Sequence, residues 1–363
     1  MTSEQEKLTL RPLGISAEKA SGAATRPLAG GPLCFSACEA SLRGAQGRGD
    51  HWVLSLPELE AWATAAGHGG EAQALLEVLA APRAPWAGLD LASPKIMGII
   101  NVTPDSFSDG GDRLDSGRAI ADGFAMLEAG ADILDVGGES TRPGAAPVTL
   151  EEELARVIPA IEELAGAGAL VSIDSHHAEV MAAALDAGAR IVNDVTALTG
   201  SAGSLALVAE TQVPVVLMHI QGEPRSMQAK PRYRDVVLDI YDYLDERLAA
   251  CRAAGIPRAR IAVDPGIGFG KTVAHNLQLL DRLALFHGLG CGVLLGASRK
   301  SFIGRLSRSE PPKERLAGSL AAALAAVARG VQILRVHDVA ETRQALTVWQ
   351  AIIEKQEVLE ALT

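Results

Sequence analysis

The strongest constraint on the fold is a regular alternation of strand-like and helix-like segments that begins at Lys95. Segments with helical spacing, such as GRAIADGFAMLEAG and LEEELARVIPAIEELAG, separate short apolar runs. The apolar runs are KIMGIINV, ADILDVGG, LVSIDS, RIVNDV, PVVLMHI, RIAVDPG, GVLLGAS and VQILRVHD. A strand followed by a helix, repeated in this way, predicts a parallel sheet with helical crossovers. The runs are continuously apolar, which is typical of strands that are buried on both faces.

Eight such units predict an α/β protein of the (β/α)8 TIM-barrel class. They span about 265 residues, close to the usual barrel size of about 250 residues. A doubly wound open sheet is the alternative. The count of eight, with no second fold-like block, favours the barrel, to which we assign residues 91–363.

The first 90 residues have a different character. SGAATRPLAGGPL is rich in Gly and Pro and has no regular pattern. Two short helices are expected over SLPELEAWATAAG and GEAQALLEVLAA, the first with Ser55 as N-cap and Glu58 three residues later. APRAPWAGLDLASP is typical of a linker. We interpret residues 1–90 as a small N-terminal extension of unknown role.

Charge and composition exclude several classes of function. The net charge of −11 and sequence pI of about 5.3 argue against a broad nucleic-acid surface, which needs clustered Lys and Arg. The first residues, MTSEQEKLTLRPLG, lack the basic start and apolar core of a signal peptide. The run LAGSLAAALAAVA is too short and too rich in Ala to span a bilayer. We expect a cytoplasmic protein with no nucleic-acid or membrane partner.

The cysteines predict neither a metal centre nor a disulfide framework. Cys34, Cys38, Cys251 and Cys291 form no C-x-x-C pair, and no histidine spacing matches them. We expect reduced structural thiols.

Polar or soft side chains stand at the carboxyl end of every predicted strand. They are Asn101, Asp135, Asp174, Asn193, Met218 with His219, Asp264, Ser298 to Lys300, and Arg335 with His337. A single polar strand end is commonly a turn former. The reacting groups of a barrel, however, collect at this rim. We therefore interpret the eight ends as one shared cup.

One end of the cup has the residue types that recognise a flat, nitrogen-rich heterocycle. A carboxylate accepts two adjacent N–H donors of a 2-aminopyrimidinone edge at once, and Asp174 and Asp264 are candidates. Asn193 suits a mixed donor and acceptor edge. Met218 and Phe269 can pack on the ring faces.

The other end of the cup is cationic. Arg299, Lys300, Arg335 and His337 belong to the last two strand ends, where barrels commonly hold phosphate. This pattern predicts an anion site.

Plainer structural roles compete with these assignments. Asp135 can brace a neighbouring loop, His219 can be a core histidine with satisfied hydrogen bonds, and Arg335 can be an ordinary ion-pair partner. His176 and His177 are expected to open the third helix of the barrel and not to act as ligands.

The segment DPGIGFGKT resembles a nucleotide phosphate loop, but the match fails. The Walker pattern needs a glycine five residues before Gly270, and Pro265 stands there. A P-loop ATPase is excluded. The glycines are expected instead to let the backbone lie close to a flat ligand.

Taken together and in order, the strand-end motifs closely resemble the dihydropteroate synthases, folate-pathway enzymes that sulfonamide drugs target. The motifs are IMGIINVTPDSFSDGG, DILDVGGESTRPGA, SIDS, IVNDV, DPGIGFGK, GASRKSFIG and RVHD. The resemblance covers about residues 95–350 and leaves the first 90 without a role. Ser175 stands where a Thr is common, and His176 and His177 follow it; neither departure is expected to abolish activity.

The resemblance implies a transferase that joins (7,8-dihydropterin-6-yl)methyl diphosphate to 4-aminobenzoate, with Mg²⁺ on the leaving diphosphate. Loss of diphosphate would leave a delocalised pterin cation, which the neutral aryl amine captures. By this analogy Asn101 contacts the metal-bound diphosphate, and Arg335 and His337 contact its oxygens. The implied catalytic residues are Asn101, Asp174, Lys300, Arg335 and His337.

The resemblance also implies the binding residues for both substrates. Asp174, Asn193, Asp264 and Lys300 would read the pterin, with Asp135 behind Asp174. Thr141 and Arg142 would lie near the aminobenzoate, and Ser301, or Ser298 as second choice, would bind its carboxylate. The loops 102–112 and 138–148 would close over the site and exclude water. A homodimer is common in this family and is expected here.

Two rival functions keep the pterin cup. A pterin-dependent methyltransferase has no use for a diphosphate clamp, so the Arg335/His337 pair and the SRKS turn argue against it. A catalytically inactive pterin-binding paralogue is disfavoured because four residues are intact: Asn101, Thr141, Arg142 and Lys300.

Overall fold

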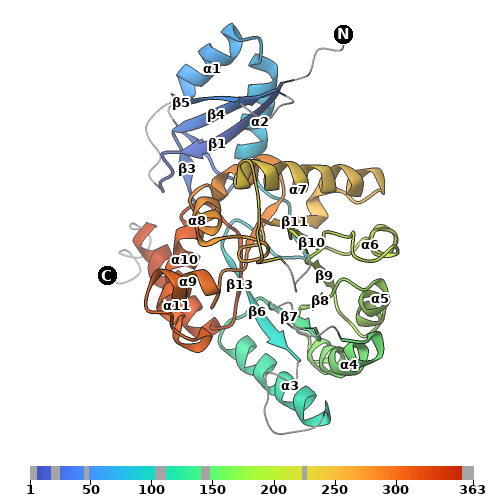
Figure 1. Cartoon of the computed structure of the whole chain (residues 1–363). Helices are drawn as coiled ribbons and strands as arrows, with labels where there is room; N and C mark the ends of the chain where they lie inside the picture. The colour runs from blue at the N-terminus through green and yellow to red at the C-terminus, as the bar shows by residue number, and fades with distance from the viewer. Residues whose placement is uncertain are drawn as a thin grey trace.

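The computed structural model describes residues 6–17, 25–44, 49–102, 112–139, 148–222 and 227–353, with the backbone alone for 112–115. A closed barrel of eight parallel strands dominates the fold, as predicted (Figure 1). Its strands are β6 (Lys95–Asn101), β7 (Ile133–Gly137), β8 (Val171–Asp174), β9 (Ile191–Asp194), β10 (Val215–Met218), β11 (Ile261–Asp264), β12 (Gly292–Leu295) and β13 (Ile333–Val336). The barrel closes between β13 and β6, where Arg335 is in register with Met97.

Helices on the outside of the barrel cover the strands. They are α3 (Asp112–Glu128), α4 (Leu150–Gly166), α5 (Ala178–Asp186), α6 (Ser204–Thr211), α7 (Val236–Ala253), α8 (Val273–Asp281), α9 (Ser301–Leu306), α10 (Leu316–Val327) and α11 (Val339–Ile353), with 3-10 turns η2 (Arg258–Arg260), η3 (Leu283–Leu289) and η4 (Pro312–Glu314). Local sequence explains where several of them begin. The side chain of Thr149 accepts a hydrogen bond from the Glu152 backbone at the start of α4, and Asp235 accepts two at the start of α7.

A small α/β unit precedes the barrel. An antiparallel sheet of β1 (Lys7–Leu13), β4 (Ala37–Arg43) and β5 (Gly49–Ser55), in the order β1-β4-β5, packs against α1 (Leu56–Ala65) and α2 (Gly69–Ala80). A short pair, β2 (Arg26–Pro27) and β3 (Cys34–Phe35), lies beside it. Both predicted helices are present, and the Ser55 backbone donates to the Glu58 carboxylate at 2.8 Å. The sheet itself was not predicted from the sequence.

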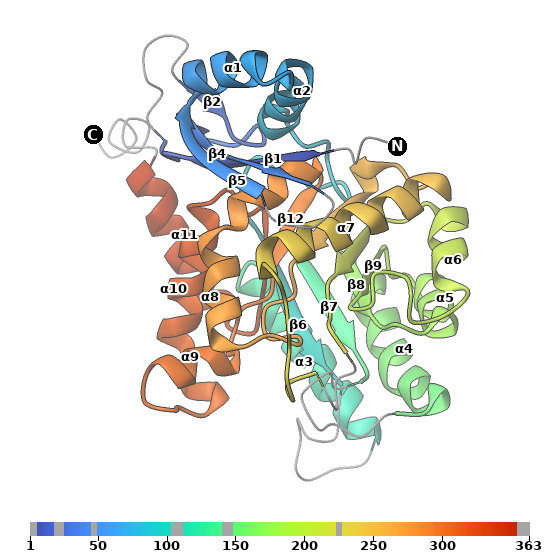
Figure 2. The same ribbon diagram turned by 45° about the horizontal axis from the view of Figure 1, so that its top comes forward.

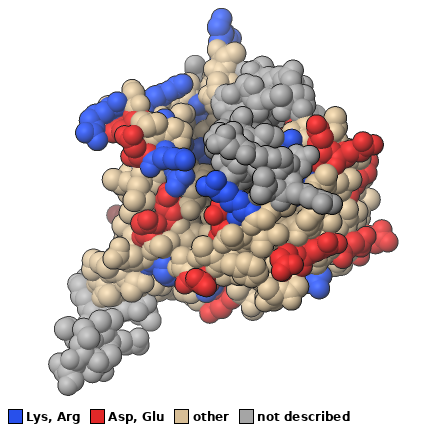
Figure 3. Space-filling view, turned by 90° about the horizontal axis from the view of Figure 1, so that it is seen from below, with Lys and Arg blue, Asp and Glu red and all other residues tan. Residues whose placement is uncertain are grey.

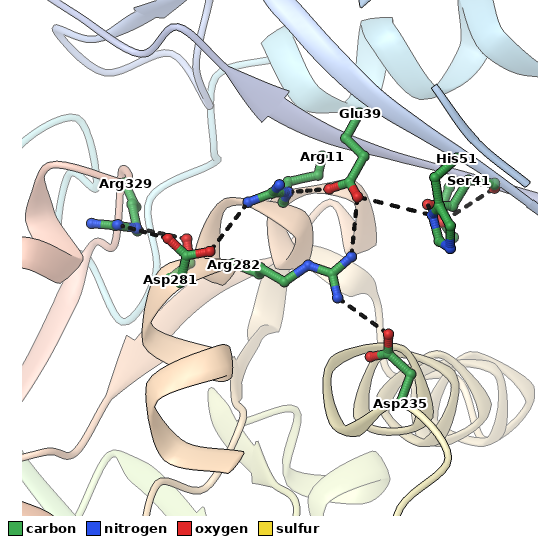
Figure 4. Close-up of polar contacts among 9 residues, drawn as sticks. Arg11, Glu39, Ser41, His51, Asp235, Asp281, Arg282 and Arg329 are labelled. Carbon is green, nitrogen blue, oxygen red and sulfur yellow. Dashed lines mark hydrogen bonds and ion pairs between the residues drawn. The ribbon is translucent and has the colours of Figure 1, made fainter. Parts of the chain in front are cut away.

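Ion pairs join the N-terminal unit to the barrel (Figure 4). Glu39 of β4 pairs with Arg11 of β1 at 2.5 Å and with Arg282, at the end of α8, at 3.3 Å. Arg282 also pairs with Asp235, at the start of α7, at 3.2 Å. Figure 2 shows the sheet between α1 and α7, so these pairs lie on its barrel side.

Two further cations of the sheet reach the same helix. Lys7 and Arg43 both contact Asp242 of α7, at 3.0 and 2.7 Å. The N-terminal unit is thus held to the barrel by charged side chains of β1 and β4.

The segment that the sequence analysis interpreted as a linker closes the base of the barrel. Trp86 and Leu91 are almost fully buried against the first residues of the barrel strands. The indole of Trp86 donates a hydrogen bond to the Arg260 carbonyl at 3.0 Å. The Arg83 guanidinium donates to the carbonyls of Cys291 and His287 at 3.1 and 2.9 Å. Residues 83–91 therefore cover the amino ends of the strands, and the predicted cup is at the opposite rim.

Two other expectations concern the whole chain. All four cysteines are buried and free, as predicted. Among the described helices, none is both long enough and apolar enough to cross a membrane.

Candidate active site

The predicted cup residues gather at the carboxyl ends of the barrel strands. The register of the parallel strands places Asp174 of β8 beside Asn193 of β9, and Met218 of β10 beside Asp264 of β11. Asp135, Asn193 and Asp264 are buried. Burial of so many polar groups at one rim requires that they pair with one another or with a ligand.

Arg335 is the centre of the cup. Its Nε donates to Asp135 Oδ2 and its Nη2 donates to Asp174 Oδ2, each at 2.6 Å. Asn193 Nδ2 also donates to Asp135 Oδ2, at 3.0 Å. One guanidinium from β13 therefore joins Asp135, in the middle of β7 and not at its end as predicted, to Asp174, the last residue of β8. The bracing role considered for Asp135 and the ion-pair role considered for Arg335 are both present in the structure.

The cluster has more carboxylates than cations around Arg335. Burial raises the pKa of Asp174 to about 7; the Arg335 charge opposes this rise and the Asp135 charge adds to it. Burial lowers the pKa of Arg335, whereas the charges of Asp135 and Asp174 raise it. The rise is larger than the fall, so the pKa of Arg335 is above its usual value. The guanidinium stays charged, and Asp174 is the group here whose ionisation changes near neutral pH.

A second ionic group stands across the cup. Burial raises the pKa of the Asp264 carboxyl, although it accepts a hydrogen bond from the Gly266 backbone at 2.7 Å. Burial and the neighbouring Arg335 charge lower the pKa of Lys300 to about 8. Lys300 Nζ lies 3.9 Å from the ring centroid of Phe269, a cation–π contact.

Phe269 also belongs to a small apolar cluster at this rim. Its other buried members are Val195, Met218 and Met227. The two residues predicted to flank a heterocycle, Met218 and Phe269, are thus in one cluster next to Asp264. An apolar wall beside buried carboxylates is what a flat, polar-edged ring requires.

The turn after β11 depends on glycine. Gly266 has a φ of +69°, and a Cβ there would lie 2.0 Å from the His219 carbonyl oxygen. The chain can make this turn, which aims a backbone N–H at Asp264, only without a side chain.

Lys271 is a buried residue of the cup that the sequence analysis did not select. Its Nζ lies 3.0 Å from His219 Nδ1 and donates to the Phe269 carbonyl at 2.9 Å. Burial lowers the pKa of Lys271 to about 7 and that of His219 to about 3. His219 is therefore buried and has a hydrogen-bonding partner, which agrees with the core-histidine role considered for it. The position of Lys271, directly after the glycine-rich turn, was the feature of the sequence that could have indicated it as a cup residue.

The anion end of the cup carries less charge than the sequence suggested. His337 lies against Ser298, with 3.1 Å between Nδ1 and Oγ, and burial lowers its pKa to about 3. The His337 imidazole is therefore uncharged at pH 7. It can offer an anion an N–H hydrogen bond but no positive charge. Arg299 pairs with Asp338, with 3.0 Å between Nε and Oδ2. Arg335 and Lys300 therefore supply the positive charge.

Ser301 and Asn101 occupy the predicted positions. Ser301 is exposed and begins α9, as the SRKS turn suggested. Asn101 is the last residue of β6 and is half-buried. Thr141 and Arg142, and most of the loops 102–112 and 138–148, lie outside the described residues.

The donor set at this rim fits Mg²⁺ that arrives with a phosphate ligand. Asn101 offers an amide oxygen, and Mg²⁺ prefers oxygen ligands and keeps several waters. In the described part of the chain, Asp135, Asp174 and Asp264 do not gather into a group of three ligands. An ion here would need oxygens from a substrate to complete its coordination.

Figure 3 views the face below the barrel in Figure 1. Lys and Arg side chains lie near the middle of this face, whereas many acidic side chains lie along its right side. The overall charge of −11 is therefore unevenly spread, and the cup can attract an anion.

Comparison with known proteins decides the family. The pterin binding enzyme family matches residues 97–337. Dihydropteroate synthase of Escherichia coli (strain K12) is 48% identical over 275 residues, which is 76% of this chain and 97% of that protein. The chain belongs to the dihydropteroate synthase family.

Solved structures of dihydropteroate synthases agree with the barrel seen here. The Xanthomonas albilineans enzyme with 4-aminobenzoic acid has a TM-score of 0.70 and 52% identity, over 75% of this chain and 98% of that one. The structure of the same enzyme with 7,8-dihydropteroate has a TM-score of 0.68 and 49% identity, over the same shares of the two chains. A Yersinia pestis dihydropteroate synthase in a sulfonamide drug complex has a TM-score of 0.69 and 46% identity, over 73% of this chain and 96% of that one.

The N-terminal unit lies largely beyond what these dihydropteroate synthases share with the chain. The pterin binding enzyme family matches only from residue 97, and the Escherichia coli relative covers 76% of this chain. The sheet of β1, β4 and β5 precedes residue 97.

Proposed function

We propose that this dihydropteroate synthase condenses (7,8-dihydropterin-6-yl)methyl diphosphate with 4-aminobenzoate to give 7,8-dihydropteroate and diphosphate. The observation that carries this function is the buried cup itself. Arg335 joins Asp135 and Asp174 at 2.6 Å each, and Lys300 stands near Asp264. Such a cup pairs acceptors for a pterin edge with cations for a leaving anion.

The pterin would occupy the side of the cup formed by β8 to β11. Asp174 and Asp264 would accept hydrogen bonds from the N–H groups of the pterin. Asn193 would contact an edge of the ring that has both a donor and an acceptor. Met218 and Phe269 would pack on the ring faces. These acceptors are buried, so a correctly paired ring replaces water with fixed hydrogen bonds. Asp174 would also offset positive charge on the pterinylmethyl carbon as its C–O bond breaks.

The diphosphate would lie toward Arg335, Lys300 and a neutral His337. Asn101 would hold Mg²⁺, which supplies positive charge to the leaving group when bound. The protein's own part is to present two fixed cations and one N–H donor in a dry pocket. The amine of 4-aminobenzoate then forms the C–N bond and loses a proton, without a strong general base.

The 4-aminobenzoate would enter over the outer rim. Ser301, exposed at the start of α9, would bind its carboxylate, with Ser298 as the second choice. Thr141 and Arg142 would lie on the other side of the entry. We also propose that the loops 102–112 and 138–148 close over both substrates and that water is thereby excluded.

The deciding experiment is diphosphate release by the full chain, with the pterin diphosphate and Mg²⁺, with and without 4-aminobenzoate. We expect release that depends on the aminobenzoate, with dihydropteroate formed. Asn101→Ala is expected to raise the Mg²⁺ concentration needed for half-maximal rate. Pterin binding without release would contradict the proposed reaction, and an unchanged Mg²⁺ requirement would remove Asn101 as its ligand.

The proposed roles of Asp174 and Lys300 predict a bell-shaped dependence of kcat/KM on pH. Below about pH 7 the Asp174 carboxyl is protonated and accepts hydrogen bonds from the pterin poorly. Above about pH 8 Lys300 loses its positive charge. Asp174→Asn is expected to remove the acid limb. Lys300→Arg is expected to move the alkaline limb upward, because a guanidinium stays protonated. A profile that stays flat from about pH 6 to 9 would contradict both roles.

We further propose a homodimer and a cytoplasmic location. Val348 and Ile352, one turn apart on α11, are 56% and 60% exposed, and an apolar stripe of this kind suits contact with a second copy. Light scattering of Val348→Glu against the natural chain tests the first proposal; cell fractionation tests the second.

A further inference from the structure

A cluster of metal-ligating side chains stands beside the cup, at the ends of β7 and β8. Glu139 follows β7, and His176 and His177 follow β8. These strands are paired, with Gly137 beside Asp174, so their following turns lie next to each other. One ligand atom from each of the three side chains lies within 4.8 Å of the others.

Glu153 of α4 orients one of the two imidazoles. Its Oε2 lies 2.8 Å from His177 Nδ1, and its side chain is 1% exposed. A carboxylate in this position keeps the proton on Nδ1 and leaves the lone pair on Nε2. Metal-binding histidines are commonly held in this way by a carboxylate behind the ring. The other oxygen of Glu153, Oε1, is buried and has no hydrogen-bond partner among the described residues.

The spacing between Glu139 and His176 suits a shared ion better than a direct hydrogen bond. Their Oε2 and Nδ1 atoms are 3.5 Å apart, which is long for a hydrogen bond. Two ligands of a tetrahedral Zn²⁺, each about 2.0–2.1 Å from the metal, are about 3.3–3.4 Å apart. The rings of His176 and His177 have centroids 4.0 Å apart, so both imidazoles are already side by side.

The charge around the cluster also favours a cation. Within the described residues, neither Glu139 nor Glu153 forms an ion pair with a lysine or arginine; each is paired only with a histidine. Arg156 donates to the carbonyl of Gly138, the neighbour of Glu139, at 2.9 Å and does not pair with either carboxylate. A divalent ion would give both carboxylates a direct positive partner.

We propose that Glu139, His176 and His177 bind a divalent transition-metal ion such as Zn²⁺, with Glu153 as the carboxylate that orients His177. Two imidazoles and one carboxylate are ligands for Zn²⁺ and similar ions, whereas Mg²⁺ prefers oxygen alone. Three protein ligands leave a position open for water. The site uses other residues than the Asn101 ligand proposed for Mg²⁺, and it departs from the expectation that the two histidines only open α5.

The position gives the ion a structural consequence. His176 is two residues beyond Asp174, and Glu139 is two residues beyond the end of β7. Bound metal would join the turns after these two strands and fix the turn that follows Asp174.

Titration of the metal-free full chain with Co²⁺, followed by visible absorption, tests the proposal. We expect one equivalent to bind with the intense bands of four-coordinate Co²⁺, to be displaced by Zn²⁺ and not by excess Mg²⁺. His176→Asn is expected to abolish these bands. Glu153→Gln, which keeps the side-chain size, is expected to weaken binding about 10–100-fold.

His68→Gln is the matched control, because His68 also lies at the start of a helix and pairs with a glutamate, Glu71, at 3.0 Å. Its Co²⁺ binding should equal that of the natural chain. Circular dichroism of each variant separates loss of metal from loss of fold. The proposal is overturned if the natural chain shows no stoichiometric Co²⁺ bands, if folded His176→Asn retains them, or if His68→Gln loses them equally.

Discussion

Arg335→Met is expected to lower kcat/KM by at least about a hundredfold and the free energy of unfolding by about 3–5 kcal/mol. The guanidinium donates to two carboxylates at 2.6 Å, and Asp135 is fully buried. Methionine fills the space of the side chain but leaves Asp135 and Asp174 without their cation. Urea unfolding, together with initial rates of dihydropteroate formation, measures the two effects.

The destabilisation in Arg335→Met should depend on pH with a definite sign. Burial already raises the folded-state pKa of Asp174 to about 7, above the usual value near 4, and removal of Arg335 raises it further. An acid whose folded pKa is raised favours the folded state at low pH and loses that contribution as pH rises through the folded value. The variant should therefore differ most from the natural chain near pH 8 and least near pH 5.

Arg343→Met is the matched control for Arg335→Met. Arg343 pairs with Asp132 at 2.7 Å, but both side chains are partly exposed, at 34% and 24%. Its loss should cost about 1 kcal/mol or less and leave the rate unchanged. Equal destabilisation in the two variants, or no pH dependence in Arg335→Met, would mean that the buried pairing is not what stabilises the cup.

Trp86→Ala is expected to destabilise the fold by about 3–5 kcal/mol without changing the catalytic site. Trp86 is 1% exposed beneath the barrel strands, and its indole donates to the Arg260 carbonyl at 3.0 Å. Truncation leaves a cavity at the sealed end of the barrel and an unpaired carbonyl. Because the cup is at the opposite end, kcat/KM of the folded protein should stay the same.

Two further substitutions separate the contributions of Trp86. Trp86→Phe keeps most of the ring and removes the N–H group, so it should cost less than Trp86→Ala. Trp62→Ala removes a tryptophan that is only partly buried in the N-terminal unit and should cost less than either. If Trp86→Ala unfolded at the same urea concentration as the natural chain, residues 83–91 would be a linker after all.

The barrel strands and their polar ends could be predicted because their signals are local in the sequence. A short apolar run followed by Asp174 or Asn193 can be recognised in the sequence without its partner strand. Closure of the sheet then brings all such ends to one rim, since parallel strands share a direction. The helix starts at Ser55 and Ser301 were equally local, and both are present.

The N-terminal sheet was missed because its strands have no clean pattern of their own. β4, ACEASLR, mixes small residues with two charged ones, and these charges are explained only by the barrel, where Glu39 pairs with Arg282. The same holds for Trp86, a single aromatic residue in a stretch rich in Pro and Gly. Its burial depends on seven strands that lie later in the chain.

The sequence by itself determined the order of the strands, the barrel class and most side chains of the cup, because each of these follows from residue type and spacing. Only the tertiary structure decided which of those side chains pair. It placed Arg335 between Asp135 and Asp174, made His337 neutral by burial, brought Lys271 onto His219, and set Glu139 beside His176. The reason is physical: ionisation and pairing depend on burial and on distances between residues up to 200 positions apart, and chain closure alone sets these distances.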